Sequence, residues 1–134
     1  MKRTEIQPSL NLQMSLRNSL YVVERRKTDV ESNEASFIIR FNASHPIFAG
    51  HFPGHPIVPG ACLIQIAEEL LSDHLEQTTR FSAIRNLKFR QPVTPEMQVV
   101  VRISEGKFEI LDLSLTEVYA QFAATYLCTH SDVQ

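Results

Sequence analysis

A stretch rich in proline and glycine, running directly into an amphipathic helix pattern, constrains this chain more than any other feature. Residues 45–60 read HPIFAGHFPGHPIVPG and hold three of the five histidines, four of the seven prolines and three of the four glycines. Each proline fixes its own φ and pushes the preceding residue toward an extended conformation, whereas glycine permits turns that other residues resist. The sequence therefore predicts a stiff loop that brings a histidine to the start of a helix.

The helix pattern covers about residues 59–76. One face of this helix would carry a largely apolar stripe with the spacing i, i+3, i+4, i+7, i+8 and i+11. The residues at these positions are Leu63, Ile66, Ala67, Leu70, Leu71 and His74. Pro59 and Gly60 supply the start, and the polar residues 77–80 form the exit. Because this is the only convincing helix pattern in the chain, we expect one long helix, with His74 packed at the end of its stripe.

Strand patterns flank the helix on both sides. Two precede it, at about residues 20–30 and 35–42, and resemble a hairpin; four follow it, at about 81–91, 97–104, 108–115 and 120–128. A phase shift at Ile110 and Leu111 indicates a β-bulge. Residues 1–18 suggest a first strand or an extended arm. The pattern predicts an α+β fold in which one long helix lies against an antiparallel sheet of about six strands.

Length and composition favour one globular domain over residues 1–134, with a core at about 18–129, an N-terminal arm at 1–17 and a C-terminal tail at 130–134. The net charge of −2 predicts no general attraction to nucleic acid. No run approaches the roughly 18 apolar residues of a membrane span, and no apolar signal sequence follows Met1. We expect a cytoplasmic protein without a membrane anchor. Cys62 and Cys128 have no zinc-type spacing and are expected to be buried free thiols.

Two motifs resemble those of the β-hydroxyacyl-ACP dehydratases of the FabZ/FabA type. Residues 51–60, HFPGHPIVPG, are similar to the family's H-F-P-x-x-P-x-x-P-G signature, and residues 87–93, LKFRQPV, are similar to its K-F-R-x-P-V strand. The motifs occur in the family's order and at about its spacing, and the resemblance covers roughly residues 20–129. It implies the hotdog fold, in which a curved sheet wraps a long central helix. It also implies a homodimer or a heterodimer with a second hotdog chain, and leaves higher oligomers open.

The chemistry of a dehydratase needs three kinds of group. Removing water from a 3-hydroxyacyl thioester requires a base for the C2 proton, an acid for the departing hydroxyl, and donors for the charge on the thioester oxygen. The resemblance assigns the base to His51. It assigns the donors to the N–H groups of Gly60 and Ala61 at the helix start, and counts Phe52 and Pro59 among the substrate-binding residues. It implies neither a cofactor nor a metal ion.

The acid is where this sequence departs from the family. The family places Glu or Asp five residues after the motif's last glycine, and this chain has Gln65 there; Glu69 stands four residues further, where the family usually has Gln. An amide cannot release a proton as an acid. One helical turn, about 5.4 Å, is large against the reach of proton transfer. Two alternatives stay open: Glu69 replaces the acid, or a partner chain supplies it, since the family's sites take the histidine from one chain and the acid from the other.

The predicted function is dehydration of a 3-hydroxyacyl thioester, most naturally one bound to an acyl-carrier protein. Arg85, Lys88 and Arg90 could attract such an acidic partner, although a solvated strand face explains them equally well. Two alternatives are an acyl-thioester hydrolase, in which Gln65 and Glu69 position a water, and a non-catalytic subunit that binds acyl chains or carrier protein.

Two other side-chain groups have simpler explanations. A metal cluster of His45, His51 and His55 is disfavoured because the loop contains no Asp, Glu or Cys. Glu68 is expected to lie on a solvated helix face.

Overall fold

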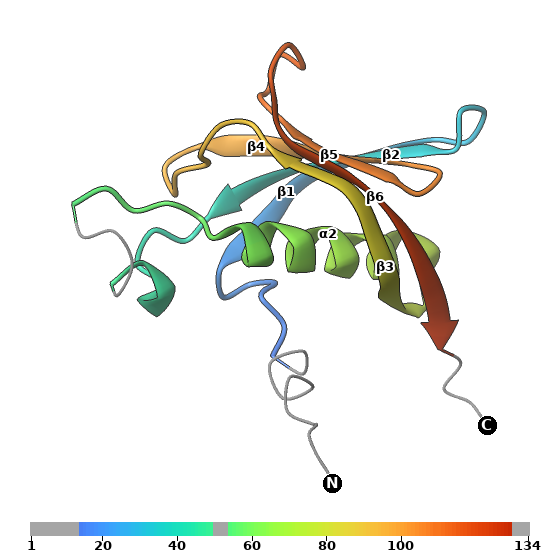
Figure 1. The fold of residues 1–134 in the computed structure, drawn as a ribbon, viewed down its shortest axis with the longest axis horizontal. Helices are drawn as coiled ribbons and strands as arrows, with labels where there is room; N and C mark the ends of the chain where they lie inside the picture. The colour runs from blue at the N-terminus through green and yellow to red at the C-terminus, as the bar shows by residue number, and fades with distance from the viewer. Residues whose placement is uncertain (1–13, 50–53, 130–134) are drawn as a thin grey trace, which may run out of the picture.

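The computed structural model describes residues 14–49 and 54–129. These residues form an antiparallel sheet that curves over one long helix (Figure 1). The strands are β1 (Tyr21–Asp29), β2 (Glu34–Phe41), β3 (Thr78–Phe89), β4 (Gln98–Ser104), β5 (Lys107–Leu111) and β6 (Val118–Thr129). The helical segments are the short 3-10 helix η2 (Pro46–Phe48) and the long helix α2 (Gly60–Leu75). The predicted α+β architecture, with two strands before the long helix and four after it, is confirmed.

The strand order across the sheet is β1-β2-β4-β5-β6-β3. Strand β3 follows α2 in the sequence, yet it pairs with β6 at the far edge and not with β4 (Figure 1). Strands β1 and β3 are therefore the two edges of the sheet. The backbone groups on the outer side of β3 have no neighbouring strand among the described residues.

Helix α2 buries the predicted stripe against the inner face of the sheet. Five of its members are buried, namely Leu63, Ile66, Ala67, Leu70 and Leu71. His74, the last member of the stripe, is half-buried, so it is packed only in part. The helix ends where Glu76 adopts a left-handed conformation at φ 57°, and the N–H of Gln77 donates to the Ser72 carbonyl at 3.2 Å. This arrangement satisfies a carbonyl of the last turn without a glycine.

The inner face of the sheet follows the predicted alternation in its centre. Phe37, Ile39 and Phe41 on β2 are buried, as are Val99, Val101 and Ile103 on β4 and Ala120, Phe122 and Ala124 on β6. Cys62 is a buried free thiol as expected, but Cys128 is exposed. The pairing of β6 with β5 ends at Ala123, so the end of β6 has only the edge strand β3 beside it.

Some boundaries differ from the sequence prediction. Strand β3 begins at Thr78, three residues before the expected start at 81, and β5 stops at Leu111 instead of continuing to 115. The bulge predicted at Ile110 and Leu111 is confirmed by the register shift there. Residues 14–20 contain no strand, only an isolated bridge between Arg17 and Tyr21, and the rest of the predicted arm lies outside the described residues. No helix in the described ranges is long and apolar enough to cross a membrane.

Candidate active site

The start of α2 is held in place by the chain on both sides of it. The N–H of Val58 donates to the carbonyl of Val93 at 2.7 Å, which ties the loop before the helix to the segment after β3. His45 accepts a hydrogen bond from the N–H of Ile47 at 3.0 Å through Nδ1, so it caps the short helix η2. His51 and Phe52, the predicted base and a predicted substrate-binding residue, lie outside the described residues.

Two backbone donors at the tip of α2 have no hydrogen-bond partner within residues 14–49 and 54–129. The carbonyl of Pro59 accepts from the N–H groups of Cys62 and Leu63, at 2.9 and 3.2 Å. No hydrogen bond joins the N–H of Gly60 or Ala61 to another described residue. These donors lie at the positive end of the helix dipole, where a developing negative charge is stabilised.

An apolar cavity of about 330 Å³ opens beside this tip. It is lined by the loop, the first turn of α2 and the end of β3, through Ile57, Val58, Gly60, Leu63, Phe89, Arg90, Gln91, Pro92 and Val93. The ring of Phe89 packs directly on Gly60. A β-carbon at position 60 would lie 2.5 Å from Cζ of that ring, so glycine is required while the ring stays there.

Gln65 points away from this cavity, toward the N-terminal segment. Its Nε2 donates to the carbonyl of Met14 and to Oε2 of Glu69, both at 3.0 Å. The predicted placement of Gln65 and Glu69 on one helix face, one turn apart, is therefore observed as a direct contact. The Gln65 amide is used within the chain.

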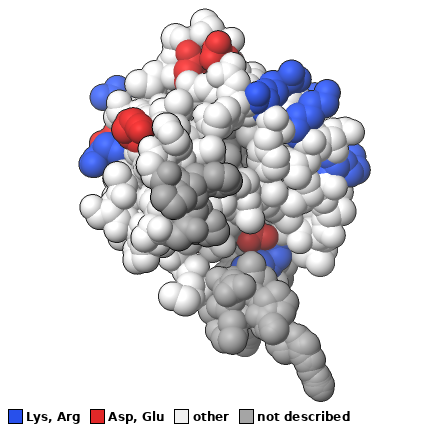
Figure 2. All heavy atoms as spheres, turned by 60° about the vertical axis from the view of Figure 1, so that its left-hand side comes forward, with Lys and Arg blue, Asp and Glu red and all other residues white. Residues whose placement is uncertain are grey.

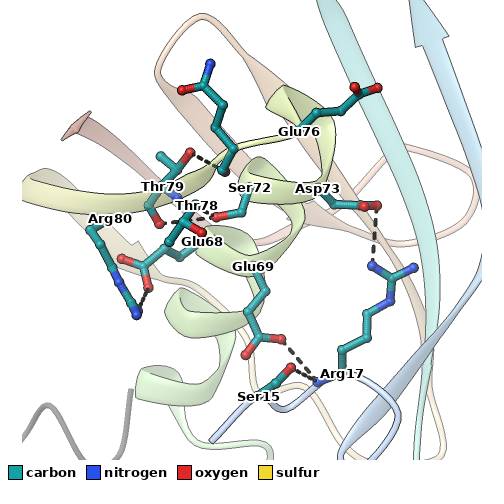
Figure 3. A pocket seen from close by; sticks show the side chains of 11 residues that line it. Ser15, Arg17, Glu68, Glu69, Ser72, Asp73, Glu76, Thr78, Thr79 and Arg80 are labelled. Atoms are coloured by element: carbon teal, nitrogen blue, oxygen red, sulfur yellow. Dashed lines mark hydrogen bonds and ion pairs between the residues drawn. The ribbon is translucent and has the colours of Figure 1, made fainter. Parts of the chain in front are cut away.

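Glu69 accepts hydrogen bonds from four donors. Oε2 accepts from the N–H of Leu16 at 2.8 Å and from Gln65. Oε1 accepts from the hydroxyl of Tyr21 at 2.8 Å and from the N–H of Arg17 at 3.1 Å, the contact that Figure 3 shows. Burial, followed by the Glu69 carboxylate, raises the pKa of Tyr21 well above its usual range, so the hydroxyl stays protonated and donates a hydrogen bond to Glu69. Glu69 thus anchors the N-terminal segment to α2.

A larger polar pocket, about 580 Å³, lies over the second half of α2 and not at its tip (Figure 3). Ion pairs cross it: Asp73 binds Arg17 at 3.3 Å and also Arg26, and Glu68 lies 3.7 Å from Arg80. The expectation that Glu68 lies on a solvated helix face is wrong. Its side chain is 12% exposed, and Oε2 accepts from the N–H of Phe81 at 2.7 Å, which links α2 to β3. The charged side chains of this pocket are paired with one another within the chain. We therefore place the candidate site at the tip of α2 and not in this pocket.

The predicted carrier-protein residues lie on β3 and just beyond it. Arg85 stands opposite Ala123 of β6, and Lys88 opposite Gln121, while Nε of Arg90 donates to Oε1 of Gln121 at 3.2 Å. All three side chains are exposed, and none forms an ion pair with another described residue. Figure 2 shows basic side chains gathered along one side of the face near the start of α2, with no acidic side chain among them.

A fourth basic residue joins this surface from β5. Lys107 also stands opposite Ala123, on the other side of β6 from Arg85. With Lys88 it lines a groove of about 630 Å³, whose acidic residues Glu34 and Glu109 are both paired with Arg102. The sequence alone did not point to Lys107, because its neighbour across the sheet is set by the pairing of strands that are distant in the chain. We call Arg85, Lys88, Arg90 and Lys107 the basic surface.

Comparison with solved structures identifies the fold. The chain superposes on the structure titled the dehydratase heterocomplex ApeI:P from Xenorhabdus doucetiae with a TM-score of 0.68 and 22% identity, over 81% of this chain and 97% of that one. It matches an uncharacterized protein from Erwinia carotovora subsp. atroseptica with a TM-score of 0.63 and 23% identity, over the same shares. Together with the helix inside a six-stranded sheet, these matches confirm the predicted hotdog fold.

Comparison of sequences identifies the family. The model of the ApeI-like family, described as ApeI dehydratase, matches residues 26–126. The chain belongs to this family, and the resemblance to FabZ-type dehydratases is confirmed.

Two curated relatives are 3-hydroxyacyl-[acyl-carrier-protein] dehydratases FabZ. The one from Geotalea uraniireducens is 38% identical over 69 residues, 45% of this chain and 48% of the relative. The one from Geobacter metallireducens is 32% identical over 92 residues, which are 62% of this chain and 61% of the relative. The chain thus spans about half to three fifths of these relatives' length.

Proposed function

We propose that this protein is a subunit of a hotdog dehydratase that removes water from a 3-hydroxyacyl thioester on an acyl-carrier protein. We further propose that its complete site forms with a second hotdog chain that carries the acid. Membership of the ApeI-like dehydratase family, the histidine motif and the names of the FabZ relatives support the reaction class. We propose the cytoplasm as the place of this reaction.

The reaction divides among three groups. His51 takes the proton from C2 of the acyl chain, and the electrons of that bond form the new C2–C3 double bond. The N–H groups of Gly60 and Ala61 stabilise the negative charge that develops on the thioester oxygen. The C3 hydroxyl leaves as water after it takes a proton from a carboxylic acid of the partner chain.

The two-chain proposal rests on the hydrogen bonds that Gln65 and Glu69 form within the chain. The position that holds the family's acid has an amide, and that amide is bound to Met14 and Glu69. Glu69 is the nearest alternative on the helix, and four donors already occupy its two oxygens. A homodimer built from this chain would place His51 of each protomer opposite an amide.

The basic surface is proposed to receive the carrier protein. Arg85, Lys88, Arg90 and Lys107 are not paired with acidic side chains of the described chain, so their charge is available to an acidic partner. Long-range attraction of this kind speeds association more than it increases affinity.

The test is to mix the chain with an acid-bearing hotdog chain and to follow hydration of an enoyl thioester by its ultraviolet absorbance. We expect activity from the mixture and little from this chain alone. The matched variant is the double exchange Gln65→Glu with Glu69→Gln, which restores the family's order and should give activity without a partner. The single variant Glu69→Gln is the control and should stay inactive.

Other outcomes identify the alternative functions. Release of a free thiol from a saturated acyl thioester would indicate a hydrolase. Binding of acyl thioester with no turnover, by the mixture and by the double exchange alike, would indicate a non-catalytic subunit.

A further inference from the structure

The outer face of the sheet, on the side away from α2, has a small apolar cluster of its own. Val100 on β4 stands opposite Leu111 on β5, and both residues are buried. Neither of them belongs to the core that packs against α2. The loop between β5 and β6 rises on this side of the sheet (Figure 1), and its Leu113 and Leu115 line one groove together with Val100. The loop therefore covers part of the face of the sheet that does not pack on α2.

This groove has a volume of about 310 Å³, and one of its walls is apolar. The apolar lining consists of Ile38, Val100, Leu113 and Leu115. The two loop leucines stay 50% and 49% exposed, and Leu115 is held at φ 63°, which is costly for a residue with a β-carbon. Leucines exposed singly need no explanation, whereas two leucines held over a groove of this size indicate a ligand site.

The opposite wall of the groove is basic because of the strand register. Paired residues on one face of a sheet form rows across the strands. Two such rows cross the groove, and each ends at a cation on the edge strand β1. The first row holds Arg25, Ile38, Val100 and Leu111, and the second holds Lys27, Ser36 and Arg102.

The groove carries one net positive charge. Three cations line it against two carboxylates, namely Arg25, Lys27 and Arg102 against Asp29 and Glu34. Arg102 is paired with Glu34 at 3.6 Å, and Asp29 accepts two backbone N–H groups of the turn after β1. Arg25 and Lys27 form no ion pair with any residue in 14–49 or 54–129. A single anionic group would therefore balance the charge at the basic wall.

The surface around the groove is less suited to a protein partner. Such a partner needs about 800 Å² on each side, with polar groups that are available for contacts. Here the neighbouring charged groups are already used within the chain. Arg40 pairs with Glu24 at 2.7 Å, Gln98 also donates to Glu24, and Glu109 pairs with Arg102 at 2.8 Å. The groups without a partner are confined to the groove, which favours a small ligand.

We propose that this groove binds the anion of a free medium-chain fatty acid. The alkyl chain lies against Leu113 and Leu115, and the carboxylate binds Arg25 and Lys27. Two strand spacings, about 10 Å, separate β4 from β1, so a medium-length chain spans the distance from the apolar wall to the basic wall. The sheet separates this groove from the tip of α2. The site is therefore distinct from the proposed thioester site, and the inference does not depend on the dehydratase function.

The affinity should depend on both ends of the ligand. Each further methylene that is buried should tighten binding by up to about fourfold, from butanoate to octanoate. The variant Arg25→Gln with Lys27→Gln should weaken octanoate binding by about tenfold and leave the binding of octanol unchanged. Both cations are exposed on an edge strand, so this variant keeps the fold.

The experiment is a titration of the full chain, labelled in its methyl groups, with octanoate below its micelle concentration, followed by nuclear magnetic resonance. We expect the methyl signals of Ile38, Val100, Leu113 and Leu115 to shift. Ser36→Trp fills the floor of the groove and should abolish these shifts. Ser44→Trp is the matched control, because it adds the same ring at an exposed serine outside the lining.

Three results would overturn the proposal. The first is the absence of any shift, or shifts confined to the cavity at the tip of α2, whose methyl groups belong to Ile57, Val58, Leu63 and Val93. The second is an equal affinity for octanoate and octyltrimethylammonium, which would remove the role of the basic wall. The third is a response of the groove to an acidic carrier protein or to anionic vesicles but not to octanoate, which would indicate a macromolecular partner.

Discussion

Gln65 and Glu69 are hydrogen-bonded to each other at 3.0 Å, yet only one of them could act as an acid. Glu69 is committed to the N-terminal segment through Leu16, Arg17 and Tyr21. Moving a proton-donating role onto it would require these contacts to break. Glu69 therefore places a carboxylate one helical turn from the family's acid position, and this carboxylate anchors the N-terminal segment to α2.

The hydroxyl of Tyr21 tests this anchoring role. Tyr21 is fully buried, and its hydrogen bond to Glu69 is 2.8 Å long. Tyr21→Phe removes a donor from a half-buried carboxylate, so we expect the free energy of unfolding to fall by about 1–3 kcal/mol in urea titrations. Tyr126→Phe, at a partly exposed tyrosine with no hydrogen bond from its hydroxyl within the described residues, is the control. Equal stability of the two variants would show that Glu69 does not anchor the segment.

The contact between Gly60 and Phe89 predicts a strong coupling between the two positions. Gly60→Ala alone must displace the ring and should lower the stability of the protein or leave it unchanged. In the Phe89→Ala background the clash is gone, and the same change should stabilise the helix by up to about 1 kcal/mol. A double-mutant cycle of thermal unfolding measures the coupling, and strict additivity would contradict the observed packing.

At the scale of elements, the turn between β5 and β6 is organised by one carboxylate. Asp112 accepts from the N–H groups of Thr116 and Glu117, each at 2.8 Å. The bond from Glu117, followed by those from Ser114 and Thr116, holds the pKa of Asp112 well below its usual value of 3.8. A competing set of hydrogen bonds of this kind ends a strand, which explains why β5 stops at Leu111 although Leu113 and Leu115 continue the apolar pattern.

The direction of this pKa shift gives a pH prediction. A carboxyl whose pKa is lowered on folding stabilises the protein fully above its unfolded value and loses that contribution as the pH falls. The stability difference between the wild type and Asp112→Asn should thus be constant above about pH 5 and shrink below about pH 4. Thermal unfolding of both proteins from pH 7 to pH 3 measures it. A difference that grows toward low pH would contradict the assignment.

The elements could be predicted from the sequence to the extent that they depend on local pattern. The helix stripe, the alternation on β2 and β4 and the bulge at Ile110 and Leu111 are all visible within a few residues. The position of β3 beside β6 could not be predicted from the sequence, because it depends on pairing between segments about 40 residues apart. The partners of Glu69 and the exposure of Cys128 follow from the same long-range arrangement. The motif around His51 indicated the site, whereas the Phe89 contact needed the folded edge strand.

At the scale of the whole molecule, the basic surface spans β3, β6 and β5 on one side of the sheet. The double variant Lys88→Glu with Lys107→Glu should slow association with an acyl-carrier protein by about tenfold or more at low salt, and by less at high salt. Stopped-flow association measures this effect. The double variant Arg25→Glu with Lys27→Glu is the control, because both residues lie on β1 at the opposite edge of the sheet and the net charge changes by the same amount. Equal slowing by this control would mean that only net charge matters.

In the proposed dehydratase the site is shared between two chains, with His51 from one and the acid from the other. A complementation assay tests this with the present chain alone. The variant His51→Ala, Gln65→Glu, Glu69→Gln carries the acid without the base, and the wild type carries the base without the acid. Each should be inactive by itself in enoyl-thioester hydration, and mixing them under exchange of subunits should produce activity. If the mixture stays inactive while Gln65→Glu with Glu69→Gln is active by itself, base and acid act within one chain and the site is not shared.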